Sequence, residues 1–256
     1  MPRVDDATLF DRQLATLAAI DVMMAAAAPD SFQLDYEGVS MLIVPATPRR
    51  SVMNAVVYER PEALEAAYER IASDFHDAGI EAWTVWVPRA DERSAEMLAA
   101  AGHVLDGSPV VMCAALEDLE LDPALPGAIS WTGGAPLQAL VSIAGPAFEF
   151  DPGELARAFE VSPPGALTYI AEHDGRPAAS VMAFDHDGDC GIYWVATAEE
   201  ARGRGLCRGL MTAALLDARE RGCTTTSLQA TKAGYPVYAG LGFRDLGPID
   251  MWELRA

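Results

Sequence analysis

Positive charge is scarce in this sequence. Its 256 residues include 18 Lys and Arg against 38 Asp and Glu, so the net charge is −20, and Lys232 is the single lysine. Surfaces that bind nucleic acids or anionic membranes need clustered positive charge, and we therefore expect no partner of either kind. An acidic surface favours a cationic partner such as an amine, although the same charge also serves solubility alone.

Metal-binding and disulfide patterns are also lacking. The four cysteines, Cys113, Cys190, Cys207 and Cys223, show no Cys-x-x-Cys spacing, and the four histidines are scattered along the chain. Disulfide frameworks and zinc sites depend on such spacings. We therefore expect reduced thiols, no metal, and a cytoplasmic protein.

No segment is long and apolar enough to span a bilayer. Residues 14–28 come nearest, but Asp21 interrupts them, and Asp5, Asp6 and Asp11 precede them. A membrane span needs about 20 apolar residues, and a signal peptide begins with basic ones. The segment therefore predicts an amphipathic, largely buried first helix.

What the sequence does contain is an alternation of strand and helix patterns. In the first half, strands are predicted at residues 32–36, 39–45, 53–58, 82–87 and 110–115, and helices at 61–78 and 94–101. The second half has strands at 191–197, 224–230 and 249–253, and helices at 205–220 and 235–240. Apolar spacing, Pro61 as a helix start and glycine stops support this assignment. The order predicts an α/β fold, of the α+β mixed-sheet kind, with helices flanking a central mixed β-sheet.

The two halves are also similar to each other in detail. Residues 98–103 and 109–112 match residues 238–243 and 248–251, with a difference of one residue in the intervening loop. We interpret this as a tandem duplication of one α/β unit; chance similarity between two Gly- and Pro-punctuated segments is the alternative. The predicted domains are residues 1–120 and 127–256.

A glycine-rich turn joins strand 191–197 to the following helix. It reads Arg202-Gly203-Arg204-Gly205-Leu206-Cys207. Such a turn leaves backbone N–H groups unpaired at the positive end of a helix dipole, which suits a diphosphate. Gly203 and Gly205 let phosphate approach the backbone, and the arginines add charged donors. The glycine spacing by itself also fits a plain connection.

A second motif follows after one further strand, with Tyr238 placed four residues before the pair Gly242-Phe243. Loop and tyrosine motif together resemble the GNAT superfamily of acyl-CoA-dependent N-acyltransferases, whose loop reads Arg/Gln-x-x-Gly-x-Gly/Ala. The resemblance is strong over residues 191–253 and looser over the rest of 129–256. Cys207 departs from it, because the family has Gly or Ala there.

The resemblance implies a chemistry and a set of residues. Acetyl-CoA would be the cosubstrate, and an acyl group, most simply acetyl, would pass by direct attack to the amine of a small molecule. The loop amides would hold the pyrophosphate, and the strand before it would pair with the pantetheine arm and splay from the next strand. The implied cofactor-binding residues are Val195, Ala196, Thr197, Arg202, Gly203, Arg204, Gly205, Leu206, Cys207 and Thr231.

Tyr238 is the implied general acid for the departing CoA thiolate, with a core aromatic as the alternative role. The general base is not identifiable, because the strand at 191–197 contains no Asp or Glu. Glu172, His173, Asp185 and Asp187, on the preceding hairpin, are candidates that fit solvated loop charges equally well.

The first half lacks this chemistry. Its loop position, residues 58–62, has no glycine, contains Pro61 and carries two glutamates, and Leu98 stands at the position of Tyr238. Proline has no amide to donate and glutamates repel phosphate. We therefore predict a degenerate GNAT-like unit that shapes the acceptor pocket or packs against the active half, with retained binding of some ligand as the alternative. The resemblance places the acceptor pocket around residues 148–159 and the first half.

A catalytically silent acyl-CoA sensor or partner protein is the main alternative to an enzyme, and a lysine acetylase acting on proteins has no positive support. The sequence leaves the acceptor, the acyl chain length and the oligomeric state open, with a homodimer as one option.

Overall fold

The computed structural model describes residues 4–122 and 131–255. The helices are α1 (Asp6–Ala25), α2 (Pro61–Asp77), α3 (Glu92–Ala100), α4 (Leu137–Ala147), α5 (Pro152–Ala158), α6 (Leu206–Glu220) and α7 (Tyr235–Ala239). The strands of the first half are β1 (Phe32–Tyr36), β2 (Val39–Ile43), β3 (Ala55–Tyr58), β4 (Ala82–Pro88), β5 (Val104–Gly107) and β6 (Val110–Ala115). Those of the second half are β7 (Trp131–Gly133), β8 (Leu167–His173), β9 (Arg176–His186), β10 (Asp189–Thr197), β11 (Thr225–Ala230) and β12 (Arg244–Arg255).

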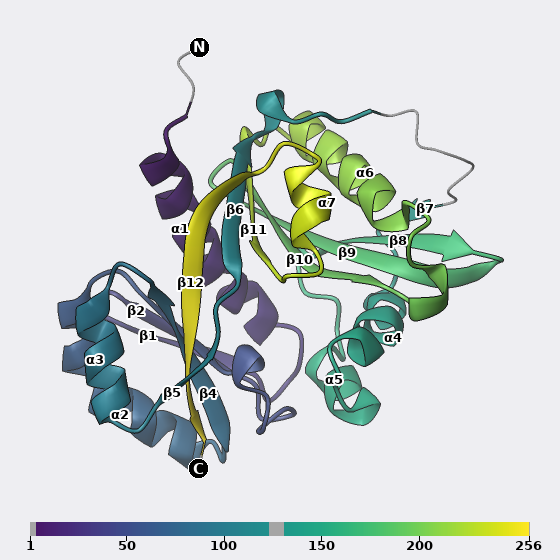
Figure 1. The fold of residues 1–256 in the computed structure, drawn as a ribbon. Helices are drawn as coiled ribbons and strands as arrows, with labels where there is room; N and C mark the ends of the chain where they lie inside the picture. The colour runs from purple at the N-terminus through teal and green to yellow at the C-terminus, as the bar shows by residue number, and fades with distance from the viewer. Residues whose placement is uncertain (1–3, 123–130, 256) are drawn as a thin grey trace.

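All the strands join one 12-stranded sheet in the order β1-β2-β3-β4-β12-β6-β11-β10-β9-β8-β7, with β5 paired to β12. Most neighbours are antiparallel, whereas β3 with β4 and β10 with β11 are parallel. The sheet is therefore mixed, and helices cover it on both sides (Figure 1). The predicted mixed α/β fold is confirmed.

The last strand of each half pairs with a strand of the other half. β6, from the first half, pairs antiparallel with β11, while the end of β12 pairs antiparallel with β4 over residues 249–255. β6 and β12 also pair with each other near Arg244 and Cys113. The division into residues 1–120 and 127–256 stays a prediction, part of which lies outside the described residues. Across it, the strand exchange makes the sheet continuous.

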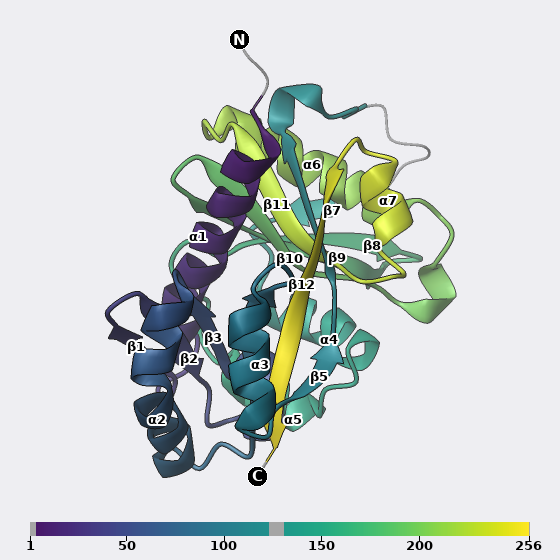
Figure 2. The same cartoon turned by 60° about the vertical axis from the view of Figure 1, so that its left-hand side comes forward.

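Helix α1 lies across both halves (Figure 2). Asp5 starts it, because its carboxylate accepts a hydrogen bond from the N–H of Thr8 at 2.8 Å, as N-cap residues do. Leu9, Leu17 and Ile20 lie in one core with side chains of α4 and α5 and of strands from both halves. The predicted first helix is present, and eight of its 20 residues are buried. Among the described residues, none of the helices has the length and apolar character required for crossing a bilayer.

The other helices enclose two further cores. α2 and α3 contribute Leu64, Phe75 and Leu98 to a core on the first half of the sheet. α6 and α7 contribute Leu210, Leu215 and Tyr238 to a core on the second half. The side chains of a strand alternate between its two faces, so these outer cores lie behind the sheet from α1, α4 and α5.

A buried carboxylate connects α1 to the second half. Asp189, at the start of β10, accepts hydrogen bonds from the hydroxyls of Thr16 at 3.0 Å, Thr225 at 2.7 Å and Ser227 at 2.6 Å. Its side chain is 2% exposed, and burial raises the pKa of the carboxyl above its ordinary value. A buried charge of this kind is tolerated only where its hydrogen bonds are made.

We expect Asp189→Ala to lower the free energy of unfolding by about 2–4 kcal/mol, because three buried hydroxyls lose their shared acceptor. Urea unfolding followed by circular dichroism measures the change. Asp77→Ala, at an exposed position of α2, is the control and should change stability by no more than about 0.5 kcal/mol. Equal effects of the two substitutions would contradict a structural role for Asp189.

Candidate active site

The glycine-rich turn before α6 forms an open cradle of backbone amides. Gly203 and Gly205 have positive φ angles of 73° and 79°, and a Cβ atom added to either would meet nothing within 4 Å. Within the part of the chain that the structure describes, the N–H groups from Gly203 to Cys207 have no hydrogen-bond partner. Positive φ suits glycine, and free amides at a helix N-terminus bind anions. The turn therefore fits a diphosphate.

The arginines of this region differ in their contacts. The Arg202 guanidinium donates to the carbonyl of Thr197 at 3.3 Å, and that of Arg208 donates to the carbonyl of Gly240 at 2.9 Å. Arg204 is exposed beside the cradle. Leu206 is buried in the core under α6. Burial raises the pKa of the Cys207 thiol to about 11, so this thiol is not a thiolate near neutral pH.

Strands β10 and β11 separate after a short parallel contact. They pair only from Asp189 to Gly191 on β10 with residues 225–227 on β11, although β10 continues to Thr197 and β11 to Ala230. On its other edge β10 stays paired, with Ala196 opposite Ser180 and Thr197 opposite Ala179. The β10 edge that faces β11 is thus left without a strand partner beyond Gly191, as the resemblance predicts for a strand that binds an extended ligand arm.

A β-bulge shapes this free edge. The register between β9 and β10 shifts between Tyr193 and Ala196, and Trp194 has a φ of 53°. Positive φ is rare for a bulky residue and marks a position held by its surroundings; the carbonyl of Trp194 accepts from the Ser180 hydroxyl at 3.0 Å. Consecutive side chains of a regular strand point to opposite faces. At the bulge, Tyr193 and Trp194 both line the same cavity.

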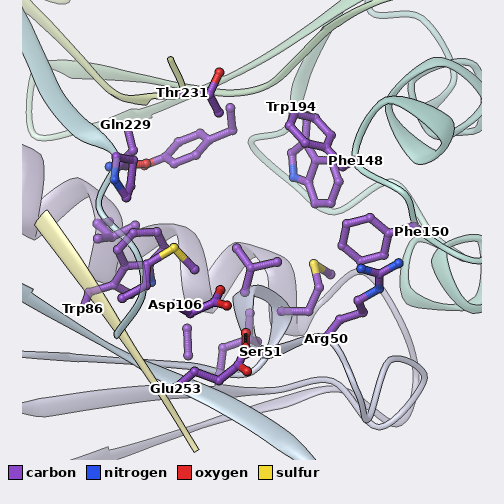
Figure 3. A pocket seen from close by; sticks show the side chains of 18 of the residues that line it. Arg50, Ser51, Trp86, Asp106, Phe148, Phe150, Trp194, Gln229, Thr231 and Glu253 are labelled. Carbon is purple, nitrogen blue, oxygen red and sulfur yellow. Dashed lines mark hydrogen bonds between the residues drawn. The ribbon is translucent and has the colours of Figure 1, made fainter. Parts of the chain in front are cut away.

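This cavity has a volume of about 1130 Å³ and lies between the two halves of the chain. The first half supplies side chains from α1, the segment 49–53 and Trp86. The second half supplies Trp194, the region of α5, and residues 229–232 at the end of β11. Figure 3 shows Thr231 and Trp194 along the upper edge of the cavity, with Ser51 and Glu253 below them. Residues of β10 and β11, the two strands that separate, therefore both line the cavity.

An aromatic wall, defined by Phe148, Phe150 and Trp194, closes one side of the cavity. Trp194 contacts Phe148 edge-on at a centroid distance of 5.8 Å and Phe150 at 5.6 Å. The guanidinium of Arg50 lies 4.8 Å from the centroid of Phe150, within the range of a cation–π contact. Four members of the segment 148–159, which we expect to line an acceptor pocket, thus lie in the cavity wall: Phe148, Phe150, Asp151 and Glu154. That this cavity receives the acceptor stays a prediction.

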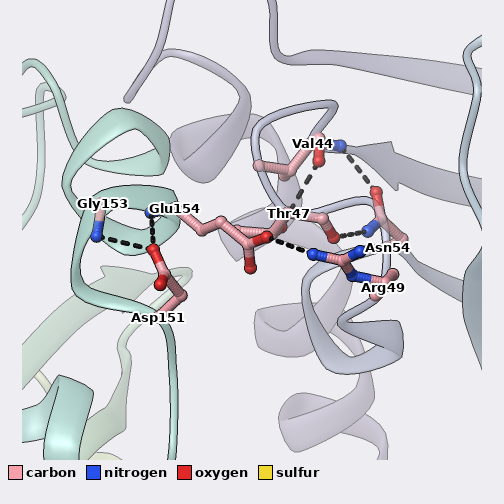
Figure 4. A network of polar contacts seen from close by, with 7 residues as sticks. All are labelled: Val44, Thr47, Arg49, Asn54, Asp151, Gly153 and Glu154. Carbon is pink, nitrogen blue, oxygen red and sulfur yellow. Dashed lines mark hydrogen bonds and ion pairs between the residues drawn. The ribbon is translucent and has the colours of Figure 1, made fainter.

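The segment that carries Arg49 and Arg50 is held by polar contacts with the backbone (Figure 4). Asn54 accepts from the N–H of Val44 at 2.8 Å and donates to the carbonyl of Thr47 at 2.9 Å. Arg49 then reaches across to Glu154 on α5 at 3.1 Å. Such an exposed ion pair adds little stability, but it connects the two halves at the cavity.

Two acidic side chains are buried in the cavity wall. Glu253 on β12 accepts from the Ser51 hydroxyl and forms an ion pair with Arg255. Asp21 on α1 is 5% exposed, and its Oδ2 atom has no hydrogen-bond partner among the described residues. Burial, and then the nearby carboxylate of Asp35, raise the pKa of Asp21 well above its ordinary value.

Tyr238 lies on the α6 side of the sheet rather than in the cavity wall. It is 6% exposed in the core of the second half and close enough to Cys207 to interact with it electrostatically. Burial raises the pKa of the phenol above its ordinary value. Thr231 lines the cavity, and its hydroxyl accepts from the N–H of Gly234 at 3.2 Å at the start of α7.

The hairpin acids considered from sequence lie elsewhere. None of Glu172, His173, Asp185 and Asp187 is among the described side chains that line the cavity, and Asp185 is bound by Arg221 at 2.6 Å. Among the described residues, no group of three or more His, Cys, Asp or Glu side chains is arranged to hold a metal.

In the first half, the start of α2 takes the place that the glycine-rich turn has before α6, and charged side chains of the protein surround it. α2 begins at Pro61, and Arg93 binds Glu62 and Glu65 in the first turns of that helix. Carboxylates therefore lie where α6 presents free amides. Tyr58, which precedes the turn, donates to Asp91 at 2.6 Å.

The sequence pointed to Thr231 and the segment 148–159 in the cavity wall, but not to its other residues. Asp21 was visible as an acid inside an apolar helix, which is a signal of a buried polar role. Trp194, Glu253 and Gln229 carried no such signal, because a bulge and an exchanged strand place them at the cavity.

Known proteins are similar to this chain in two ways: a family model matches part of its second half, and solved structures match its overall fold. Residues 137–243 match the model of the acetyltransferase (GNAT) family. A GCN5-related N-acetyltransferase from Kribbella flavida superposes with a TM-score of 0.68 at 19% identity, covering 94% of this chain and 95% of that one. One from Sphaerobacter thermophilus gives 0.57 at 16% identity, covering 94% and 93%. No curated protein matches the sequence.

A tandem GNAT protein from the clavulanic acid biosynthesis pathway is also similar, with a TM-score of 0.60 at 16% identity over 96% of this chain and 95% of that one. The fold of the present chain is accordingly that of two tandem GNAT-like units. Residues 137–243 accordingly form a domain of the GNAT family of acetyltransferases.

Proposed function

We propose that the protein is an N-acetyltransferase that uses acetyl-CoA and a small-molecule amine. The observation that carries the proposal is the combination of free amides at Gly203–Cys207 with the separation of β10 from β11. An anion cradle and an unpaired strand edge are the features needed by a ligand with a diphosphate and an extended amide-containing arm. Acetyl-CoA has both, and supplies an acyl thioester.

The amides and Arg204 would bind the diphosphate, while Val195, Ala196 and Thr197 would offer the free β10 edge to the pantetheine arm. The α6 side of the sheet would then hold the body of the cofactor. The separation between the strands leads to the cavity on the α1 side, where the acyl group would meet the amine. A backbone N–H on the same edge is suited to stabilising the oxyanion.

Tyr238 is proposed as the general acid. Its phenol lies next to the N-terminal turn of α6, near Cys207, on the side where the cofactor would enter. The raised pKa keeps the hydroxyl protonated over the neutral range, which is the form that can protonate a departing thiolate.

The first half is proposed to form part of the cavity wall that contacts the acceptor, without binding a second cofactor. Arg93 and its glutamates occupy the helix start that corresponds to the cradle, so a diphosphate would have to displace an ion pair and approach two carboxylates.

We expect Gly205→Val to weaken coenzyme A binding at least about tenfold, because a side chain at φ 79° strains the turn and covers the amides. Isothermal titration with coenzyme A gives the affinity. Gly222→Val is the matched control, since Gly222 has a φ of 96° and open space at the other end of α6. It should keep the affinity within about twofold while suffering similar strain. If both variants bind like the wild type, the cradle is not the diphosphate site.

We expect Tyr238→Phe to lower kcat by about 10- to 100-fold while leaving acetyl-CoA affinity within about twofold, because only the proton donor is lost. Release of free thiol with a panel of small amines measures turnover. Tyr235→Phe removes a hydroxyl from the same helix, one that donates to Asp245 at 3.0 Å, and should leave kcat nearly unchanged. Unaltered turnover in Tyr238→Phe would show that another group, or water, protonates the thiolate. Tight binding of acetyl-CoA with no turnover of any amine by the wild type would instead indicate a silent sensor.

A further inference from the structure

The cavity between the halves contains an acid that makes no hydrogen bond within the described protein. The Oδ2 atom of Asp21 is buried and without a partner, and Asp21 is 5% exposed. The Nε2 atom of Gln229, in the same cavity wall, is also buried and unpartnered. Buried polar atoms are nearly always paired, so two cavity-lining residues with unpartnered polar atoms indicate a place where a polar ligand group would find partners.

The surroundings of Asp21 distinguish it from the other acids of the cavity. Glu253 is bound by Ser51 and Arg255, and Glu154 by Arg49. Asp21, by contrast, has only the like-charged Asp35 and the phenol of Tyr193 acting on it electrostatically. Asp21 thus offers the cavity a carboxyl group that forms no ion pair with any Lys or Arg among the described residues.

The rest of the cavity is suited to an apolar body. Its aromatic wall of Phe148, Phe150 and Trp194 is reinforced from behind by Phe159, which meets Trp194 edge-on at 5.1 Å. The positive φ of Trp194 holds the indole toward the cavity at the bulge. Aromatic side chains of this kind pack against rings by offset or edge-on contact.

We infer that Asp21 binds the ammonium group of the acceptor, and that the acceptor is an amine carried on an aromatic ring which packs against the aromatic wall. This inference rests on the proposed function and names its substrate class. It assigns to α1, which belongs to the first half, the residue that recognises the amine.

A consequence is that amine binding releases a proton. Burial followed by the charge of Asp35 raises the pKa of Asp21 well above its ordinary value, which shifts the carboxyl of the free protein toward its protonated form. A bound ammonium ion stabilises the carboxylate, and Asp21 must then give up its proton. The ionisable groups that act on it from the neighbouring strands are Asp35 on β1 and Tyr193 on β10.

The test is direct titration of the full-length protein with 2-phenylethylamine and with ethylamine, which differ only in the ring. The wild type should bind 2-phenylethylamine at least about tenfold more tightly. Titration in two buffers of different ionisation enthalpy should show release of up to about one proton per site. Asp21→Asn should weaken binding by about tenfold or more and abolish the proton release, whereas Asp21→Glu should retain part of both.

Asp106→Asn is the control, because Asp106 lines the same cavity but is exposed, and it should behave like the wild type. Equal binding of the two amines, or unchanged binding and proton release in Asp21→Asn, would overturn the inference. Thermal melting verifies that the variants fold. Coenzyme A titration of the same samples separates the two proposals: if it fails while 2-phenylethylamine binds through Asp21, the proposed function is wrong and the amine site stands.

Discussion

The arrangement of the site depends on one departure from regular sheet structure, the separation of β10 from β11. Parallel strands normally satisfy their N–H and C=O groups along their whole length, whereas these two pair only from Asp189 to Gly191 on the β10 side. The separation leaves backbone groups free on the β10 edge and places residues of both strands in the cavity wall. The glycine turn at the start of α6 follows β10 in the chain. The bulge at Trp194 adds to the separation by turning two consecutive side chains toward the cavity.

Such an opening has to be supported by its surroundings, because unpaired backbone groups weaken a sheet. Asp189 gives that support at the start of the short paired stretch that precedes the separation, since its three hydroxyl partners come from α1 and β11. On the far side, β6 pairs with β11 along the whole of Thr225–Ala230. A helix and a strand from the first half therefore hold both sides of the opening in the second.

The exchange of final strands explains why the cavity lies where it does. β12 crosses from the second half and pairs with β4, carrying Glu253 and Met251 to the cavity wall. α1 lies across the junction and adds Asp21 from the opposite direction. A single GNAT-like unit would lack these walls. The first half thus contributes to the site through structure, even though its own helix start at Pro61 is occupied by Arg93 and two glutamates.

The sequence by itself determined the local features. Periodic apolar residues fixed α2 and the strands, glycines at Gly203 and Gly205 fixed the turn, and the motif around Tyr238 indicated the family, because each depends on residues close together in the chain. Only the tertiary structure decided which strands are neighbours, and hence the strand exchange, the cavity, and the burial of Asp21 without a partner. The hydrophobic pattern of a strand fixes which of its faces is buried. Its partner strand depends on contacts between segments more than 100 residues apart, such as Thr225 with Ala115, and no local pattern encodes them.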